Sequence, residues 1–301
     1  MKRYILFNPL SGRGKSEEDS ELLAKYYGGE AELLDITGIE DYSAFFSELK
    51  EEDTVIICGG DGTLNRFVNN TEGIDIRCRI FYHACGTGND FLHDISDGEA
   101  GDPIDVTKYL IGLPTVKVKG KTYRFLNNVG FGIDGYCCEV GDRLKTESDK
   151  PVNYTAIAIK GLLFHYKPTG ATVTIDGVTY RYENVWLAPT MKGRFYGGGM
   201  MPTPEQDRKS ADGELSVMLM FCKSKIKTLA VFPSIFKGEH VKHEKMVAVH
   251  KGKSIKVVFD RPAAVQIDGE TVLDVTEYEA FAGEATETDA TVRNGYDTAL
   301  I

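Results

Sequence analysis

The sequence predicts an α/β domain with a parallel sheet, followed by a β-sandwich-type domain with a few helices. Three observations predict this fold class. The chain has 301 residues, about twice the ~150 residues of an average domain. Short apolar runs alternate with helix-like segments over the first hundred residues, and β-rich runs follow after about residue 105. We expect one domain over 1–110, a second over 111–283, and a tail over 284–301 whose role the sequence does not indicate.

The first half is expected to form a parallel sheet covered by helices on both faces. In such sheets, ligands bind at the carboxyl ends of the strands. Each predicted strand ends in polar or glycine-rich sequence, which favours a site at this edge. The predicted strands cover 4–7, 31–36, 54–57 and 80–83, and the predicted helices cover 16–27, 42–50 and 63–69.

The second half consists of β-rich runs with three helical interruptions. Asp176-Gly177 joins two of the runs and is a favourable hairpin turn. The predicted strands cover 115–118, 123–128, 171–175, 179–187, 215–221, 246–250, 254–259 and 263–267, and the predicted helices cover 135–144, 153–165 and 226–236.

The composition excludes several classes of protein. Acids outnumber bases by 45 to 35, and the net charge of -10 argues against a general nucleic-acid binder. The most apolar stretch, near 154–164, is interrupted by Lys160 and is shorter than the ~18 residues that a membrane span needs. The six cysteines show no CxxC spacing, which is typical of reduced thiols in a cytoplasmic protein.

Two glycine-rich loops follow predicted strands and suit the binding of an anionic group. In Gly59-Gly60-Asp61-Gly62-Thr63, the glycines let the backbone approach a phosphate closely, and Asp61 suits a metal ion or its water shell. The segment 85–90 repeats this design one strand later, with Thr87 as a hydroxyl donor and Asp90 as a second carboxylate. Two such loops after successive strands favour a phosphate site over simple turns.

The motifs GGDGTLN at 59–65, GTGNDF at 86–91 and YGGGM at 196–200 resemble the diacylglycerol kinase catalytic-domain family, in its bacterial lipid-kinase branch. DGEL at 212–215 and IDGE at 267–270 extend the resemblance, which covers about residues 2–280. It implies a two-domain protein that binds ATP in a cleft between the domains. It also implies transfer of the γ-phosphoryl group to a lipid hydroxyl, with diacylglycerol as the leading acceptor and phosphatidic acid as the product.

The resemblance further implies which residues hold the nucleotide and its metal. Asp61, Asp90 and Asp105 would hold the catalytic Mg²⁺, partly through waters, because phosphoryl transfer depends on positioning and charge neutralisation. Arg66 departs from the family, which usually has an acid at this place. The implied nucleotide contacts are Asn8, Pro9, Leu10, Ser11, Gly12, Thr37, Gly59, Gly60, Asp61, Gly62, Thr63, Leu64, Asn65, Arg66, Gly86, Thr87 and Asn89.

A second, structural Mg²⁺ site is implied by the resemblance around the motif at 212–215. Its implied ligands are the Asp212 carboxylate and the backbone carbonyls of Lys209 and Glu214. Oxygen ligands on a loop suit Mg²⁺. A turn that holds no metal is the alternative.

Asp268-Gly269-Glu270 supplies two candidates for the general base. A carboxylate near the acceptor hydroxyl can take its proton as the phosphoryl group arrives. Asp268 and Glu270 are two residues apart, so on an extended backbone both side chains would point the same way. Both stay candidates, and a structural turn is the alternative. For the loop at 59–63, we expect Asp61→Ala to abolish turnover and to leave thermal unfolding nearly unchanged.

The segment 221–256 holds nine lysines and only two acids, Glu239 and Glu244. Each lysine near an anionic bilayer contributes ~1 kcal/mol, so we expect this segment to dock the protein on the inner face of the membrane, beside its lipid substrate. A solvated lysine-rich face is the alternative. The family permits homodimers, but the residues themselves do not establish one.

Three other functions stay open at this point. The protein could be a kinase for another lipid alcohol, such as phosphatidylglycerol or a sphingoid base, because the same motifs serve several acceptors. An NAD kinase would normally carry a stretch like Thr-Gly-Ser-Thr-Ala-Tyr, which this chain lacks. A catalytically inactive nucleotide-binding protein is the third alternative, and the presence of all the expected acids argues against it.

Overall fold

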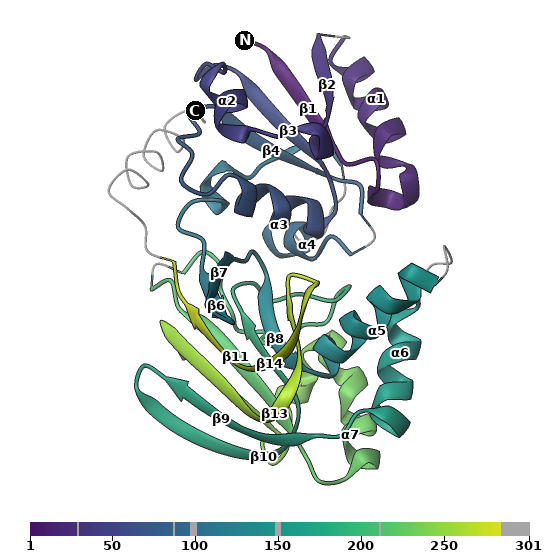
Figure 1. The fold of residues 1–301 in the computed structure, drawn as a ribbon, viewed down its shortest axis with the longest axis vertical. Coiled ribbons are helices and arrows are strands. Elements are labelled where there is room, and N and C mark those ends of the chain that lie inside the picture. The colour runs from purple at the N-terminus through teal and green to yellow at the C-terminus, as the bar shows by residue number, and fades with distance from the viewer. Residues whose placement is uncertain (29, 87, 97–100, 148–151, 211, 284–301) are drawn as a thin grey trace. The chain divides into compact units, whose positions relative to one another are not determined.

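The computed structural model describes residues 1–28, 30–86, 88–96, 101–147, 152–210 and 212–283. These residues form two compact units, Met1–Leu113 and Pro114–Gly283 (Figure 1). The first unit contains a parallel sheet with helices, and the second contains antiparallel strands arranged as a β-sandwich-like domain. The predicted fold class is confirmed. The predicted tail over 284–301 lies outside the described residues.

The first unit contains a five-stranded sheet with the order β2-β1-β3-β4-β5. The strands β1 to β4 are parallel, and β5 is antiparallel to β4. The strands are β1 (Arg3–Phe7), β2 (Ala31–Asp35), β3 (Thr54–Gly59), β4 (Arg79–Ala84) and β5 (Ile104–Asp105). The helices are η1 (Ser11–Gly14), α1 (Ser16–Tyr26), η2 (Ile36–Gly38), α2 (Tyr42–Ser47), α3 (Asp61–Asn70), α4 (Asp90–Ile95) and η3 (Thr107–Tyr109).

Helices cover both faces of this sheet, because successive residues of β1 face different helices. Ile5 packs in one cluster with Leu23 of α1, whereas the ring of Tyr4 meets Phe45 of α2 edge-to-face at 5.7 Å. Neighbouring residues of a strand point to opposite faces, so α1 and α2 lie on opposite faces of the sheet. The apolar run of β1 is therefore buried on both sides, as expected for a strand of a parallel sheet.

The second unit contains nine strands that pair antiparallel throughout. Its strands are β6 (Thr115–Val118), β7 (Lys121–Arg124), β8 (Asn128–Gly132), β9 (Thr169–Ile175), β10 (Val178–Met191), β11 (Leu215–Phe221), β12 (Val247–Gly252), β13 (Ser254–Ile267) and β14 (Glu270–Phe281). Its helices are α5 (Ile133–Glu147), α6 (Tyr154–Lys160), η4 (Gly161–His165), α7 (Lys225–Val231), η5 (Phe232–Lys237) and η6 (Glu239–Lys242).

Two long strands, β10 and β13, connect the parts of this second sheet. β10 pairs with β9 over its first half and with β8 and β11 over its second half. β13 likewise pairs with β9 near its start and with β8 near its end, and both long strands contain register shifts where they change partners. The strands β8, β10, β9 and β13 thus form a closed circuit. Its interior is filled by apolar side chains such as Phe131, Val173 and Val257.

The three predicted helical interruptions of the second half are confirmed as α5, as α6 with η4, and as α7 with η5. Their apolar sides pack with Trp186 and Met220 in a second cluster on the sheet. Figure 1 shows α5, α6 and α7 gathered on one side of this unit. Among the described residues, no helix is long and apolar enough to cross a membrane.

The prediction of a single strand over 123–128 is wrong. β7 ends at Arg124, and β8 begins only at Asn128. The chain leaves the ladder between them because the N–H groups of Leu126, Asn127 and Asn128 donate hydrogen bonds to the Asp268 carboxylate. A side-chain acceptor thus replaces the strand-to-strand bonds at this point.

Candidate functional site

Three loops lie at the carboxyl ends of β1, β3 and β4, which are consecutive neighbours in the parallel sheet. They begin at Asn8, Gly60 and Cys85. Parallel strands end at the same edge of a sheet, so the three loops meet there. The structure therefore brings together the two glycine loops and the segment 8–12 that the sequence analysis selected.

Thr63, in the first turn of α3, ties the loop after β1 to the loop after β3. Its Oγ1 accepts a hydrogen bond from Asn8 Nδ2 at 2.9 Å and lies 2.9 Å from Ser11 Oγ. Asn8 Oδ1 accepts a hydrogen bond from the N–H of Leu10 at 3.0 Å. Asn8 and Thr63 are buried, so the hydrogen bond between them is shielded from water. The segment 8–12 is therefore held in one position beside the N-terminus of α3.

The three loops approach one another so closely that glycine is required. A Cβ atom on Gly86 would lie 2.6 Å from Gly60 Cα. A Cβ on Gly12 would lie 2.6 Å from Cys85 O, and Gly12 has a φ of +59°, which residues with side chains rarely adopt. Backbone packs directly on backbone at this edge, which is the arrangement that lets a phosphate group reach main-chain N–H groups.

The N-terminus of α3 contributes further to this anion-binding character. Gly60 is the N-cap residue of this ten-residue helix and, as a glycine, has no side chain with which to cap it. The first N–H groups of a helix and the positive end of its dipole favour a negatively charged group. This edge of the sheet is therefore suited to phosphate.

Asp61 joins two of the loops by capping the next helix. Its Oδ2 accepts a hydrogen bond from the N–H of Asp90 at 2.7 Å, and its Oδ1 accepts one from the N–H of Phe91 at 3.0 Å. A carboxylate at a helix N-terminus satisfies N–H groups that have no partner within the helix. This role of Asp61 could not be predicted from the sequence, because it depends on α4 beginning beside the loop after β3.

Asp105, the third acid predicted for the catalytic metal, is engaged elsewhere. Its Oδ1 accepts hydrogen bonds from the Thr107 N–H at 3.0 Å and from Thr107 Oγ1 at 2.7 Å. Its Oδ2 accepts from the guanidinium of Arg79. Within the described ranges, no group of three or more His, Cys, Asp or Glu side chains is placed to hold a metal ion. The water-bridged arrangement of Asp61, Asp90 and Asp105 stays a prediction.

The other predicted nucleotide contacts differ in what their side chains offer. Leu64 and Asn65 are buried in the first half of α3, so neither offers an exposed side chain to a ligand. The Thr37 hydroxyl donates to Asp35 Oδ1 at 2.7 Å within the turn after β2. Asn89 has a φ of +48° and donates from Nδ2 to the Gly86 carbonyl at 3.0 Å. Pro9 and Gly62 are partly exposed, Arg66 is exposed, and Thr87 lies outside the described residues.

Asp268 and Glu270 do not lie on an extended segment, so the expectation that both side chains point the same way for that reason is wrong. Asp268 and Gly269 have φ values of +46° and +91°, and Ile267 pairs with Glu270. Asp268 and Gly269 form the tight hairpin turn between β13 and β14, for which Asp-Gly is a preferred sequence. The predicted hairpin turn at Asp176-Gly177, with φ values of +47° and +86°, is confirmed and has the same form.

The Asp268 carboxylate is held by the chain before β8. Oδ2 accepts a hydrogen bond from the N–H of Leu126, and Oδ1 accepts from the N–H groups of Asn127 and Asn128 at 2.8 and 2.9 Å. Arg208 reaches the same segment, donating to the Leu126 carbonyl at 2.6 Å and to Asn127 Oδ1 at 2.7 Å. The contacts of Arg208 and of residues 126–128 could not be predicted from the sequence, because no local pattern links positions so far apart. Glu270, at the start of β14, is exposed.

A buried carboxyl group lies next to the same turn. Asp134, in the first turn of α5, accepts hydrogen bonds from the Gly135 N–H at 2.8 Å and from Gln266 Nε2 at 3.4 Å. Gln266 Oε1 accepts the N–H of Gly269 at 2.8 Å and so supports the hairpin turn. Burial raises the pKa of Asp134 to about 6, and the two hydrogen bonds oppose this rise only in part.

The predicted structural Mg²⁺ site contains a turn. Gly213 has a φ of +66°, and its N–H donates to the Ser210 carbonyl at 3.1 Å. The carbonyl of Glu214, one of the predicted ligands, accepts a hydrogen bond from Gln206 Nε2 at 2.9 Å. The Lys209 N–H donates to Asp207 Oδ1 at 2.8 Å. Asp212 is exposed and is the one predicted side-chain ligand, so occupancy by a metal stays a prediction.

The lysine-rich segment 221–256 extends over several elements. It runs from the end of β11 through α7, η5, η6 and β12 into β13. Lys242 forms an ion pair with Glu239 at 3.3 Å, and Lys256 forms one with Glu277 at 3.1 Å. Its lysines therefore do not belong to a single helix face, and anionic-lipid docking through the whole segment stays a prediction.

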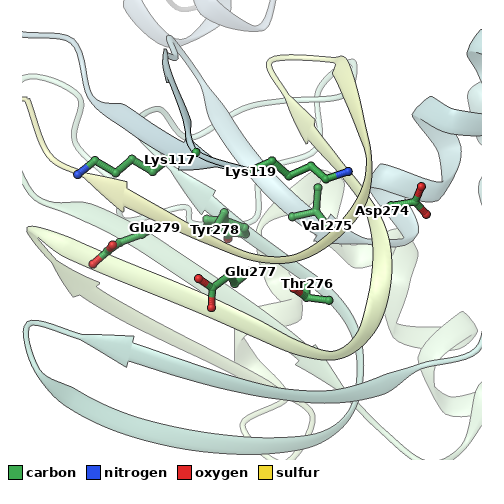
Figure 2. Close-up of a pocket in the computed structure, with 9 residues that line it drawn as sticks. Lys117, Lys119, Asp274, Val275, Thr276, Glu277, Tyr278 and Glu279 are labelled. Atoms are coloured by element: carbon green, nitrogen blue, oxygen red, sulfur yellow. The ribbon is translucent and has the colours of Figure 1, made fainter.

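A shallow pocket of about 370 Å³ lies on the second unit, between β14 and the turn that joins β6 to β7. Figure 2 shows that lysines and acids line it, and Lys119 Nζ donates to the Leu273 carbonyl at 3.0 Å. None of the predicted site residues lines this pocket. It has no part in the site described above.

Comparison with known proteins finds one family match in each half of the chain. Residues 2–119 match the model of the diacylglycerol kinase catalytic domain, and residues 127–281 match that of the YegS C-terminal NAD kinase beta sandwich-like domain. A Mycobacterium tuberculosis protein named diacylglycerol kinase is 26% identical over 268 residues, 85% of this chain and 84% of its own. One of the same name from Bacillus subtilis is 25% identical over 284 residues, 90% of each chain.

Solved structures show the same fold. A Bacillus anthracis structure described as a diacylglycerol kinase has a TM-score of 0.56 and 19% sequence identity, and the match covers 94% of each chain. At this identity the likeness concerns the fold alone.

Proposed function

The chain belongs to the diacylglycerol kinase catalytic-domain family, and on this premise we propose that it is an ATP-dependent lipid kinase. The family and the names of its bacterial relatives support a lipid kinase. Diacylglycerol is the proposed acceptor and phosphatidic acid the proposed product. In the reaction, the lipid hydroxyl oxygen bonds to the γ-phosphorus, the bond from that phosphorus to the bridging oxygen of ADP breaks, and the hydroxyl proton passes to a base.

The observation that carries the proposal is the meeting of the three loops at the sheet edge. Main-chain groups of Gly60, Gly86 and the segment 8–12 pack so closely that Cβ atoms have no space, and the N-terminus of α3, with glycine as its N-cap, lies beside them. These residues fit a nucleotide's phosphates, because backbone N–H groups bind phosphate and glycine permits the close approach. Thr63 and Asp61 would keep the loops in register while the phosphates are bound.

The carboxylates of Asp61 and Asp90 fit a magnesium ion that is bound mainly by phosphate oxygens and water. Mg²⁺ in kinases usually takes only one or two carboxylates from the protein. When bound, it would neutralise charge on the transferring group. Asp61 would also keep the N-terminus of α4 in place through the N–H groups of Asp90 and Phe91.

The different surroundings of Asp268 and Glu270 support different roles. Three N–H donors occupy the Asp268 oxygens, which suits a residue that positions the turn and the chain before β8. Glu270 is exposed at the start of β14. We assign the proton acceptor to Glu270 and the positioning role to Asp268.

A transfer assay with γ-labelled ATP tests the proposal. Purified protein is given Mg²⁺ and a panel of acceptors in mixed micelles: diacylglycerol, phosphatidylglycerol, a sphingoid base and NAD. Label on diacylglycerol is the expected result. Label on another lipid would keep the mechanism and change the acceptor, whereas label on NAD alone, or on nothing, would overturn the proposal.

Two substitutions test the base. Glu270→Gln is expected to lower kcat at least ~100-fold, because a general base contributes about 10²–10⁴. Asp268→Asn leaves at least one of three amide groups without its acceptor, so it should lower the free energy of unfolding by about 2 kcal/mol as well. Full turnover in Glu270→Gln, together with an inactive but normally stable Asp268→Asn, would assign the proton acceptor to Asp268 instead.

The proposal places the protein at the inner face of a membrane, where a lipid acceptor is found. Lysines of the segment 221–256 would supply attraction to anionic lipid. Binding to vesicles with and without anionic lipid measures this attraction directly, and equal binding to both kinds would argue against it.

A further inference from the structure

Two helical segments of the second unit expose large apolar side chains to solvent. Phe164 of η4 is 72% exposed and Ile226 of α7 is 81% exposed. Ile159 and Leu163 are also exposed. Water around apolar side chains of this size is unfavourable, so their exposure indicates a surface that something else covers.

These side chains are outward-facing residues of well-packed helices. In α7, Thr228 and Val231 are buried against the unit, and Ile226 faces away. In the other segment, Ile157 of α6 and Leu162 of η4 are buried, and Ile159 and Phe164 face away. The apolar residues are therefore additional to those that hold the helices on the sheet.

The two segments lie side by side. α7 packs against η4, and Lys225 Nζ donates a hydrogen bond to the Leu163 carbonyl at 3.4 Å. Figure 1 shows α6 and α7 on the same side of the unit. We call this surface the apolar–basic face, and it consists of Ile159, Lys160, Leu163, Phe164, Lys225, Ile226 and Lys227.

Charge distinguishes this face from the rest of an acidic protein. The chain carries a net charge of -10, yet neither 152–167 nor 221–238 contains an aspartate or glutamate. The same two segments contain lysines alone as charged residues, at 160, 167, 223, 225, 227 and 237. Exposed apolar side chains ringed by lysines are the chemistry that enters the boundary of an anionic bilayer.

We propose that the apolar–basic face docks the protein on the surface of an anionic lipid bilayer, with Phe164 and Ile226 entering the headgroup region and the lysines contacting anionic headgroups. The inference rests on the proposed function only for the presence of a bilayer beside the enzyme. The apolar–basic face differs from the lysine-rich segment 221–256 in two respects. It includes residues of α6 and η4, and it leaves out the lysines of η6, β12 and β13.

Co-sedimentation with vesicles tests the face without any use of catalysis. The full-length protein is mixed with vesicles of phosphatidylcholine containing 30% phosphatidylglycerol, or of phosphatidylcholine alone, in about 0.1 M salt. We compare wild type with Phe164→Ser/Ile226→Ser, with Lys160→Gln/Lys227→Gln, and with the matched control Val178→Ser/Lys121→Gln, whose residues are exposed elsewhere on the unit.

We expect the wild type to sediment with the anionic vesicles. Phe164→Ser/Ile226→Ser should lower the partition coefficient at least ~20-fold, and Lys160→Gln/Lys227→Gln about 25-fold, or about fivefold for each lysine. The control should bind like wild type. Equal binding to neutral vesicles, or equal loss in the control, would overturn the proposal. Face variants that bind as well as wild type would also overturn it. The same holds if the face substitutions change only the oligomeric state, as measured by sedimentation velocity.

A parallel kinase assay separates this inference from the proposed function. With a short-chain diacylglycerol dissolved in detergent, both face variants should turn over like wild type, and with substrate in anionic vesicles they should lose most of their activity. Vesicle binding that depends on the face, in a protein that labels no lipid, would refute the proposed function and leave the docking face intact. Wild-type activity of both variants on vesicles would refute the docking face and leave the kinase intact.

Discussion

Replacing Asp61 by alanine should both inactivate the protein and destabilise it. The inactivation follows from the proposed role of the carboxylate beside the nucleotide phosphates. The destabilisation follows from geometry. The Asp61 carboxylate accepts two part-buried hydrogen bonds, from the N–H groups of Asp90 at 2.7 Å and Phe91 at 3.0 Å, and both are lost together. The structure therefore predicts that Asp61→Ala measurably destabilises the protein. This differs from the expectation from sequence alone, in which thermal unfolding stays nearly unchanged.

The magnitude can be worked from the two bonds. Loss of a helix N-cap costs about 0.5–2 kcal/mol, and the upper end of this range applies because one carboxylate accepts from two N–H groups. Asp90 and Phe91 are buried, so water replaces these bonds poorly. We expect a loss of about 2 kcal/mol, and Asp61→Asn, which keeps one acceptor, should lose about half as much.

Urea unfolding followed by circular dichroism measures this loss, and transfer of labelled phosphate measures turnover. Asp41→Ala is the matched control, because Asp41 caps α2 by accepting the Ala44 N–H at 2.9 Å and lies outside the candidate site. It should cost about 1 kcal/mol and leave turnover intact. An Asp61→Ala protein with the wild-type urea midpoint would refute the capping argument, and one with wild-type turnover would refute the role of Asp61 in the reaction.

Two further predictions follow from close packing and from burial. Gly86→Ala places a Cβ 2.6 Å from Gly60 Cα, so it should weaken ATP binding at least ~10-fold by calorimetry, whereas Gly38→Ala, with open space around its Cβ, should bind ATP normally. Asp134→Asn removes a carboxyl whose pKa burial raises to about 6. Because this pKa lies above that of the unfolded chain, the protonated group contributes stability that is full below about pH 4 and is lost as the pH rises through 6. The variant's advantage in unfolding free energy should therefore grow to about 3 kcal/mol between pH 4 and 6 and then level off. A pH-independent difference would contradict the assignment.

Much of the fold could be predicted because it depends on local patterns. The alternation of strands and helices before residue 105, and the helices around 135–144, 153–165 and 226–236, have regular apolar spacing and are confirmed. The glycine loops could also be found, since close backbone approach requires glycine at Gly60 and Gly86 whatever their exact partners. These signals lie within a few residues of each other in the sequence.

The contacts that arrange the candidate site could not be predicted in the same way. The bonds from residues 126–128 to Asp268 join positions 140 to 142 apart, and the capping of α4 by Asp61 joins positions 29 and 30 apart. Nothing local marks such pairs. The hairpin turn at Asp268-Gly269 is different, because its Asp-Gly signal was available and was outweighed by the extended interpretation of the strand before it.

The hydrogen bonds at Asp268 also link the site to the order in which the chain is made. Asp268 lies at the tip of the hairpin formed by β13 and β14, the last two strands of the second unit, and its partners precede β8, near that unit's beginning. A ribosome must therefore release nearly the whole unit before the turn can close on residues 126–128. A nascent chain that already contains the complete glycine loops would still lack this carboxylate in place. The loop after β7 and the start of β8 therefore reach their final arrangement only after the last two strands of the unit have been made.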